Sequence, residues 1–435
     1  MKNDKILGLK LYPEKPFVHL QLSIMMILQF IVMGCINPIV SLYMKDYLHF
    51  SGFQIGSVLA LSAMFSFVAP VVSTFIADRL ISAERFLSVV HLLSAVLMFF
   101  LSYQTTYYSF LIFFILYTVV LNPAGPLTNA IVFHHLPDSN HFGGIRLWGT
   151  IGWIIAAWIC GFVATTEKPI LVSNDLHSAL QISAYASLLL ALYALFLPKG
   201  IKKINRVKNF LPMDSFKIFF DPAFLIMSIF SCLIMFIDRF YIFGAAPFLK
   251  SIGYAEKDIL PILSIGQIPE ILLLLIMGVL IKYFGFKLTI LAGIALEIFR
   301  FLIFALGTSD LFLFSGIIVH GMTWALFFVP ITIFIDKKCL PKTRAGIQQL
   351  YSFASGTGVI AGNLISGITA DFTTSVQGKI NYSHFWLIPL ILSIITFIAF
   401  ALLFKESQPA LGIPDSYGSN EKSKKTATLE KSHTI

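Results

Sequence analysis

The sequence predicts an all-α integral membrane protein with twelve transmembrane helices in two six-helix halves. Hydrophobic residues make up 57% of the 435 positions and charged residues only 12%, whereas about 25% of an ordinary soluble domain is charged. The hydrophobic residues gather into stretches that reach the roughly 20 residues needed to cross a bilayer. A basic polar stretch midway along the chain separates six of these stretches from six more.

The predicted helices follow one another with short polar connections. In the first half, residues 1–197, they lie at 17–44, 53–77, 86–104, 107–132, 146–166 and 179–197. Residues 198–220 form the basic stretch, which we expect to be a central cytoplasmic loop. In the second half, residues 221–405, the helices lie at 221–249, 257–283, 287–306, 310–335, 344–371 and 384–404. The polar tail, residues 406–435, is predicted to be disordered and cytoplasmic.

Positive charge is distributed unevenly between alternate connections. If the N-terminus is cytoplasmic, most Lys and Arg residues fall on the inner side. The outer side then holds Lys45, Lys168, Lys250, Lys257 and Lys379. This bias predicts that both termini are cytoplasmic. It also accounts for the net charge of +9 through anionic lipid headgroups, with no nucleic-acid partner.

The sequence shows no pattern typical of an enzyme or a metal site. Its four cysteines are scattered and have neither metal-ligand nor disulfide spacing. The paired His134 and His135, near Asp138 and His141, fall in a predicted cytoplasmic loop, which we interpret as polar rather than metal-binding. We therefore predict no catalytic residues, no metal and no cofactor.

Charged side chains inside the predicted spans are rare. Each costs about 3 kcal/mol at the centre of a membrane helix, so each needs a functional or structural reason. Apart from other charges at the span ends, the charged residues in the spans are Arg146, Asp238, Arg239, Glu270, Glu297 and Arg300.

Gln267 and Glu270 are the first candidates for a polar site. They are three residues apart, so their side chains share one helix face. Pro269 between them interrupts the helical hydrogen bonds, which favours a kinked, water-accessible segment. A carboxyl in such a place could take up a proton, as a proton symporter requires. The alternative is a structural ion pair with another helix.

Arg146, Thr150 and Trp153 form a second candidate group. They are spaced i, i+4 and i+7, so a cation, a hydroxyl and an indole ring lie along one stripe. Such a stripe could orient a polar aromatic solute. The alternative for Arg146 is an interfacial side chain that extends to the headgroups.

The other charged residues in the spans are interpreted as members of ion pairs. Asp238 and Arg239 are adjacent, about 100° apart on a helix, so we expect them to pair with different helices. Glu297 and Arg300 are spaced i, i+3 and can neutralise each other, which favours a structural role.

Several stretches resemble a known family. Residues 145–153 resemble the fifth-span signature of the bacterial nucleoside:proton symporters of the major facilitator superfamily, and residues 264–270 resemble their eighth-span Gln-x-x-Glu. Residues 77–79, 126–129, 298–301 and 334–338 are similar too, and the resemblance runs in order from about residue 20 to 405.

The resemblance implies a set of solute-binding residues. The positions that match the family's nucleoside contacts are Arg146, Thr150, Trp153, Gln267, Glu270, Asp238, Tyr241 and Trp324. In a register shifted by one residue, Arg239 takes the place of Asp238. Ala325 stands where the family has an aspartate, so this carboxylate is missing.

The resemblance also implies a function. It indicates a monomeric importer of nucleosides in the bacterial inner membrane, driven by protons through alternating access of the two halves. Glu270 would carry the proton, with Asp238 as a second carrier. One alternative is a permease for aromatic acids of the phenylpropionate type, in which Arg146 and Arg239 would bind a carboxylate. Another is a non-transporting membrane sensor.

Overall fold

The computed structural model describes residues 16–66, 82–136, 142–163, 176–198, 222–307, 309–338 and 344–405. Within these ranges the chain is helical apart from short turns and one isolated bridge between Thr374 and Ile380. Nine of the described helical segments are long and apolar enough to cross a membrane. The prediction of an all-α membrane protein is confirmed. The predicted tail and the central loop, apart from Pro198, lie outside the described residues.

Two of the spans predicted in the N-terminal half, 17–44 and 107–132, are each divided into shorter helices. The N-terminal helices are α1 (Pro16–Gly34), α2 (Val40–Leu42), the short π-helix η1 (Tyr43–Tyr47), α3 (Gly52–Ser66), α5 (Ala83–Ser102), α6 (Tyr107–Leu121), α7 (Ala124–His135), α8 (Phe142–Val163) and α9 (His177–Ala194). Pro123 separates α6 from α7. His134 and His135 end α7 rather than lying in a loop, while Asp138 and His141 are outside the described residues.

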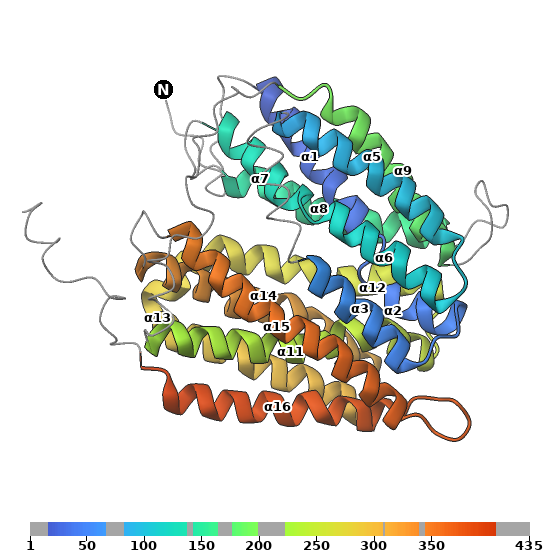
Figure 1. Cartoon of the computed structure of the whole chain (residues 1–435). Helices are drawn as coiled ribbons and strands as arrows, with labels where there is room; N and C mark the ends of the chain where they lie inside the picture. The colour runs from blue at the N-terminus through green and yellow to red at the C-terminus, as the bar shows by residue number, and fades with distance from the viewer. Residues whose placement is uncertain are drawn as a thin grey trace, which may run out of the picture.

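The C-terminal helices are longer and lie side by side in Figure 1. They are α11 (Pro222–Ser251), α12 (Glu256–Ser264), α13 (Gln267–Leu306), α14 (Asp310–Lys338), α15 (Arg344–Phe372) and α16 (Tyr382–Leu403). α13 bends at Gly285, whose φ of 72° lies in a region that side-chain-bearing residues rarely adopt. This bend falls between the spans predicted at 257–283 and 287–306.

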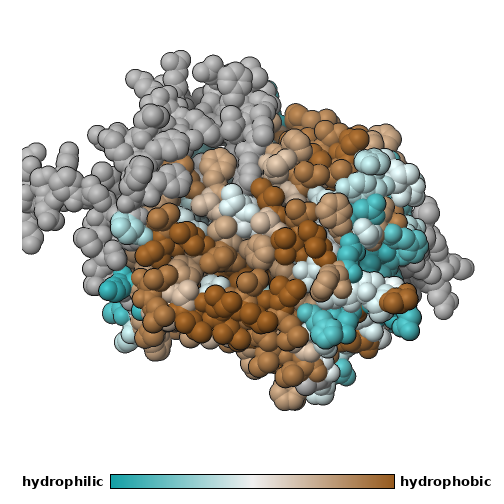
Figure 2. Space-filling model, turned by 60° about the horizontal axis from the view of Figure 1, so that its bottom comes forward, coloured by the Kyte–Doolittle hydropathy of each residue, from teal (hydrophilic) through white to brown (hydrophobic). Residues whose placement is uncertain are grey.

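The outer surface of the molecule is apolar. On α16, Ile391, Ile395, Ile398 and Leu402 recur at helical spacing along one face, and each is more than half exposed. Figure 2 shows brown, hydrophobic side chains spread over this side of the molecule. An apolar surface of this extent is typical of a protein whose solvent is lipid.

The N- and C-terminal helices meet closely through two pairs, α3 with α15 and α8 with α12. A Cβ atom at Gly367 would lie 2.2 Å from the Gly52 carbonyl oxygen, so only glycine allows this approach. The carboxylate of Asp371 accepts the backbone N–H groups of Gly52 at 2.6 Å and Phe53 at 2.7 Å. The start of α3 is therefore capped by the end of α15.

A buried polar network also ties the N-terminal helices together. The His91 ring lies 2.8 Å from Gln29 Oε1 and 2.9 Å from Ser187 Oγ, and all three residues are buried. The contacts join α5 to α1 and α9. These side chains serve packing rather than the cavity.

Candidate functional site

A cavity of about 550 Å³ lies between the N-terminal and C-terminal helices. This volume is in the range of small-molecule binding sites. Residues of α1, α3, α6 and α8 line one side, and residues of α11 to α15 line the other. The cavity is lined by all eight residues that the sequence assigned to solute binding, namely Arg146, Thr150, Trp153, Asp238, Tyr241, Gln267, Glu270 and Trp324.

The α8 stripe faces the cavity as its spacing predicts. The Arg146 guanidinium lies 4.2 Å from the centre of the Phe30 ring, a cation–π contact. Arg146 therefore points into the protein rather than extending to headgroups. Thr150 is nearly buried one turn further on, and the half-buried Trp153 adds an aromatic surface. Cation, hydroxyl and indole line the same wall.

Gln267 and Glu270 sit just after a break in the eighth predicted span. α12 ends at Ser264 and α13 begins at Gln267, so the interruption precedes Pro269 instead of occurring at it. Pro269 is the third residue of α13, in the first turn, where a missing N–H leaves no helical hydrogen bond unmade. The break directs both polar side chains to the cavity, where Glu270 faces the opposite charge of Arg146.

A glycine on α14 makes room for this break. A Cβ atom at Gly321 would lie 1.9 Å from the carbonyl oxygen of Gly266 and 3.0 Å from the Cβ of Glu270. α14 thus holds the start of α13 in place through direct backbone contact.

The prediction that Asp238 and Arg239 pair with different helices holds in part, because Asp238 lies 3.9 Å from Arg300 of α13 but also binds Arg239. Arg239 Nη2 donates to Asp238 Oδ2 at 2.5 Å, so the adjacent residues bind each other. Their Cβ atoms diverge on the helix, but the long arginine side chain turns back to reach the carboxylate. Both residues line the cavity.

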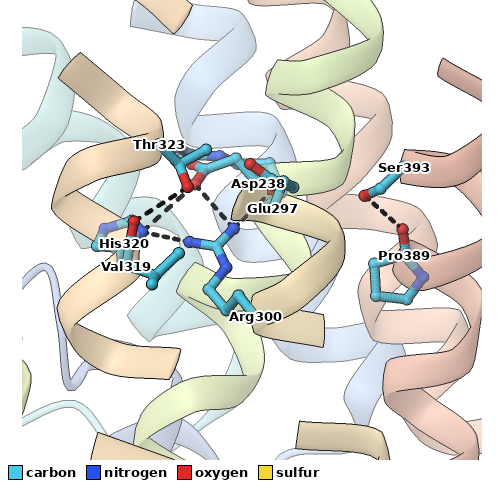
Figure 3. Close-up of polar contacts among 9 residues, drawn as sticks. Asp238, Glu297, Arg300, Val319, His320, Thr323, Pro389 and Ser393 are labelled. Carbon is cyan, nitrogen blue, oxygen red and sulfur yellow. Dashed lines mark hydrogen bonds and ion pairs between the residues drawn. The ribbon is translucent and has the colours of Figure 1, made fainter. Parts of the chain in front are cut away.

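Behind them lies a second, fully buried pair. Arg300 Nη2 donates to Glu297 Oε1 at 2.6 Å, as the i, i+3 spacing predicts. Arg300 also donates from Nη1 to His320 Nδ1 at 2.5 Å, and its Nη2 lies 3.9 Å from Asp238 Oδ1. Figure 3 shows these groups converging from α11, α13 and α14. The pair is therefore part of a larger ionic cluster.

His320 is the residue that the sequence reasoning missed. It lines the cavity, and its ring stacks on Tyr241 at 4.0 Å between centroids. The available signal was a histidine inside an apolar span, four residues before Trp324 and so on the same face. Trp324 contacts Phe328 at 4.1 Å between centroids. Ala325 is fully buried away from the cavity, against Met277 and Leu326.

The described residues contain no group of three or more His, Cys, Asp or Glu side chains that could hold a metal ion. The cavity instead offers charged groups, amides, hydroxyls and aromatic rings. Such an arrangement can bind a polar, ring-bearing solute and exchange a proton with cavity water.

Comparison with known proteins agrees with this chemistry. The family model described as "Nucleoside H+ symporter" matches residues 17–409. The Escherichia coli (strain K12) protein YegT is 30% identical over 406 residues, covering 89% of this chain and 94% of YegT. The nucleoside permease NupG of the same organism is 28% identical, with 89% and 96% covered.

Solved structures show the same fold. A crystal structure of a mutant of the nucleoside transporter NupG matches with a TM-score of 0.81 at 27% identity, covering 89% of this chain and 100% of the other. A D-xylose-proton symporter, 11% identical, matches with a TM-score of 0.70 over 90% of this chain and 98% of its own. The fold is that of major facilitator transporters.

Proposed function

This chain belongs to the nucleoside H+ symporter family, and from that premise we propose how its cavity carries a nucleoside together with a proton. The protein is a multi-pass membrane transporter that couples nucleoside movement to protons, and it is not an enzyme. The aromatic-acid alternative is not favoured by these relatives. The observation that carries the residue assignment is the convergence of all eight predicted side chains on one cavity between the N- and C-terminal helices.

The proposed architecture has twelve spans in two halves, residues 1–197 and 221–405. The bend at Gly285 supports counting α13 as parts of two spans, which adds one span to the nine candidate segments. α3 and α9, which are not among those nine segments, would supply the other two. The basic loop 198–220 and the tail 406–435 would both be cytoplasmic, as would the N-terminus. We place the protein in the bacterial inner membrane as a monomer.

In the proposed site the nucleoside lies between the two halves. Trp153 and Trp324 offer faces on which a base can stack. Arg146 and Thr150 supply hydrogen-bond donors from α8, and Gln267 offers both a donor and an acceptor from α13. Asp238 and Tyr241, from α11, would complete the contacts to the ribose or the base.

Glu270 is the proposed proton carrier. It lines the cavity at the broken start of α13, and Arg146, of opposite charge, lines the same cavity from α8. A carboxylate with an opposing charge and access to the cavity can be neutral in one state and ionised in another. Asp238 is the second candidate carrier.

Alternating access fits the contacts between the halves. In the proposed topology, α3 and α12 begin on the outer side, where Gly52, Asp371 and the α8–α12 pair bring the halves together. The structure then corresponds to a state closed on the outside. Rocking of one half against the other would open this end and close the inner one.

Uridine uptake into proteoliposomes with an acidic exterior tests this proposal. Wild-type protein should accumulate uridine only while the pH gradient lasts. Glu270→Gln should abolish accumulation but retain exchange of labelled for unlabelled uridine at equal pH. Asp310→Asn, which alters an exposed carboxylate outside the cavity-lining set, is the matched control. Undiminished accumulation by Glu270→Gln would remove Glu270 from the proton path.

A further inference from the structure

Arg239 lines the cavity, and its positive charge is paired with the carboxylate of the adjacent Asp238. Its side chain is 19% exposed, and that of Asp238 is 7% exposed. In the described part of the chain, Asp238 is the acid that pairs with Arg239, and the Arg239 Nε has no hydrogen-bond partner. The ionised Asp238 carboxylate therefore accepts from the Arg239 guanidinium, which could otherwise donate hydrogen bonds to a solute.

The path of the Arg239 side chain is set by α15. A Cβ atom at Gly362 would lie 2.9 Å from both Cβ and Cγ of Arg239, so the arginine stem rests directly on this glycine. Val359, three residues before Gly362, and Asn363, one residue after it, line the cavity and carry no ionisable group. The guanidinium can thus turn from Asp238 toward the cavity without meeting another charge from α15.

Asp238 and Glu297 differ in their access to the cavity. Asp238 lines it, whereas Glu297 is 0% exposed and sits 2.6 Å from Arg300. Arg300 lies 3.9 Å from Asp238, and its charge is already balanced by Glu297. Asp238 is therefore the carboxylate of this cluster that can exchange a proton with cavity water.

His320 stays neutral in this arrangement. An arginine can only donate hydrogen bonds, so the Nδ1 that Arg300 contacts must be an acceptor, and the ring proton is on Nε2. His320 Nδ1 lies 3.9 Å from Asp238 Oδ1, and the Tyr241 ring stacks on the His320 ring. The other ionisable groups of the cavity are Arg146 and Glu270, while α16 carries its own, Tyr382 and His384, in its first turn.

We propose that Asp238 binds a second co-transported proton and that this proton releases Arg239 to bind the solute. The inference rests on the proposed function. A proton from cavity water neutralises the Asp238 carboxylate and leaves the Arg239 guanidinium without a counter-charge. A buried unpaired cation is costly, and acceptor oxygens of a nucleoside can satisfy it. Proton and solute therefore stabilise each other's binding, and each leaves more easily once the other has gone.

Arg300 and Glu297 act as positioning residues in this scheme. Because Glu297 balances Arg300, the nearby guanidinium does not hold Asp238 permanently ionised. Arg300 also keeps His320 in the neutral form beside Asp238. The cluster then has one carboxylate that titrates and one that remains a fixed counter-ion.

The number of coupled protons can be measured as a zero-flux ratio. Vesicles with a gradient of one pH unit, and membrane potential held at zero, are prepared with different ratios of internal to external uridine. The zero-flux ratio is the one at which no net uridine movement occurs. Each coupled proton multiplies the zero-flux ratio by about ten, because one pH unit corresponds to about 1.4 kcal/mol. Wild type should reach about a hundredfold and Asp238→Asn about tenfold, whereas Asp310→Asn should match wild type.

The outcomes separate the two proposals. A wild-type ratio of one, unaffected by the pH gradient, contradicts the proposed function. A wild-type ratio of about ten leaves that function intact and contradicts the second proton, as does an unchanged ratio in Asp238→Asn. Thermal unfolding at the wild-type temperature shows that each variant is folded.

The role of Arg239 is tested by uridine binding at several pH values. Asp238→Asn should bind uridine with an affinity that varies less steeply with pH than in the wild type, because Glu270 alone then couples binding to a proton. Arg239→Gln should weaken binding at least tenfold at low pH, and Asp238→Asn should add no further effect in that background. If Asp238→Asn does not fold, uridine binding by Arg239→Gln alone still tests the release mechanism. Wild-type affinity in Arg239→Gln would overturn the release mechanism.

Discussion

Removing the Asp371 carboxylate should open the contact that closes one end of the molecule. Both of its oxygens accept backbone N–H groups at the start of α3, at 2.6 and 2.7 Å. Replacing a capping residue of this kind by alanine costs about 1 kcal/mol of stability. Asp371 is exposed, so we take that value rather than the larger one for buried charged hydrogen bonds. Asp371→Ala should therefore shift the equilibrium between the two access states about fivefold toward the one open at this end.

A cysteine at the cavity residue Ser264, in a background without other cysteines, reports this shift. A membrane-impermeant thiol reagent added from outside should modify it about five times faster in Asp371→Ala than with Asp371 present. Asp371→Asn, which keeps one acceptor oxygen, should give an intermediate rate. Asp310→Ala changes an exposed carboxylate at the start of α14 and should leave the rate unchanged. An unaltered rate in Asp371→Ala would refute the capping role.

Three further predictions concern other contacts. Gly321→Ala would place a methyl group 1.9 Å from a backbone oxygen at the start of α13, so uridine affinity should fall and thermal stability should drop by about 1–3 kcal/mol. Burial tends to raise the pKa of Asp46, but hydrogen bonds and charges from lysines, Lys250 foremost, hold it below its usual value. The contact between Asp46 and Lys250 should therefore persist above that lowered pKa and be lost as pH falls through it, seen as faster thiol labelling from outside at acidic pH. His91→Leu removes the partner of the buried Gln29 Oε1, while Ser187 keeps its bond to the backbone oxygen of residue 91, and it should lower stability by about 1–3 kcal/mol, measured by thermal unfolding, without changing solute affinity.

The sequence was sufficient where helical periodicity decides the geometry. Arg146, Thr150 and Trp153 share a stripe because residues four and seven apart lie on one face, and the cavity is lined by that face. The Glu297–Arg300 pair follows from the same rule. Hydrophobic length likewise indicated the membrane fold, since no tertiary contact is needed to recognise a span.

The sequence was insufficient where a side chain leaves its own face. Asp238 and Arg239 were expected to pair with different helices because their Cβ atoms diverge, yet the arginine side chain is long enough to turn back to Asp238. Pro269 signalled a break, but its position relative to that break depends on Gly321, which comes from another helix. His320 had no charge pattern to mark it. Its role depends on Arg300 and Tyr241, which only the folded chain brings to it.

The coupling of solute to proton is measured most directly by the protons themselves. Uridine added to weakly buffered proteoliposomes without a pH gradient should draw protons inward with it and raise the external pH. We expect this alkalinisation for the wild type and its loss in Glu270→Gln, because a variant that only exchanges uridine gives no net entry of uridine or of protons. Uridine entry into wild-type vesicles with no movement of protons would contradict it.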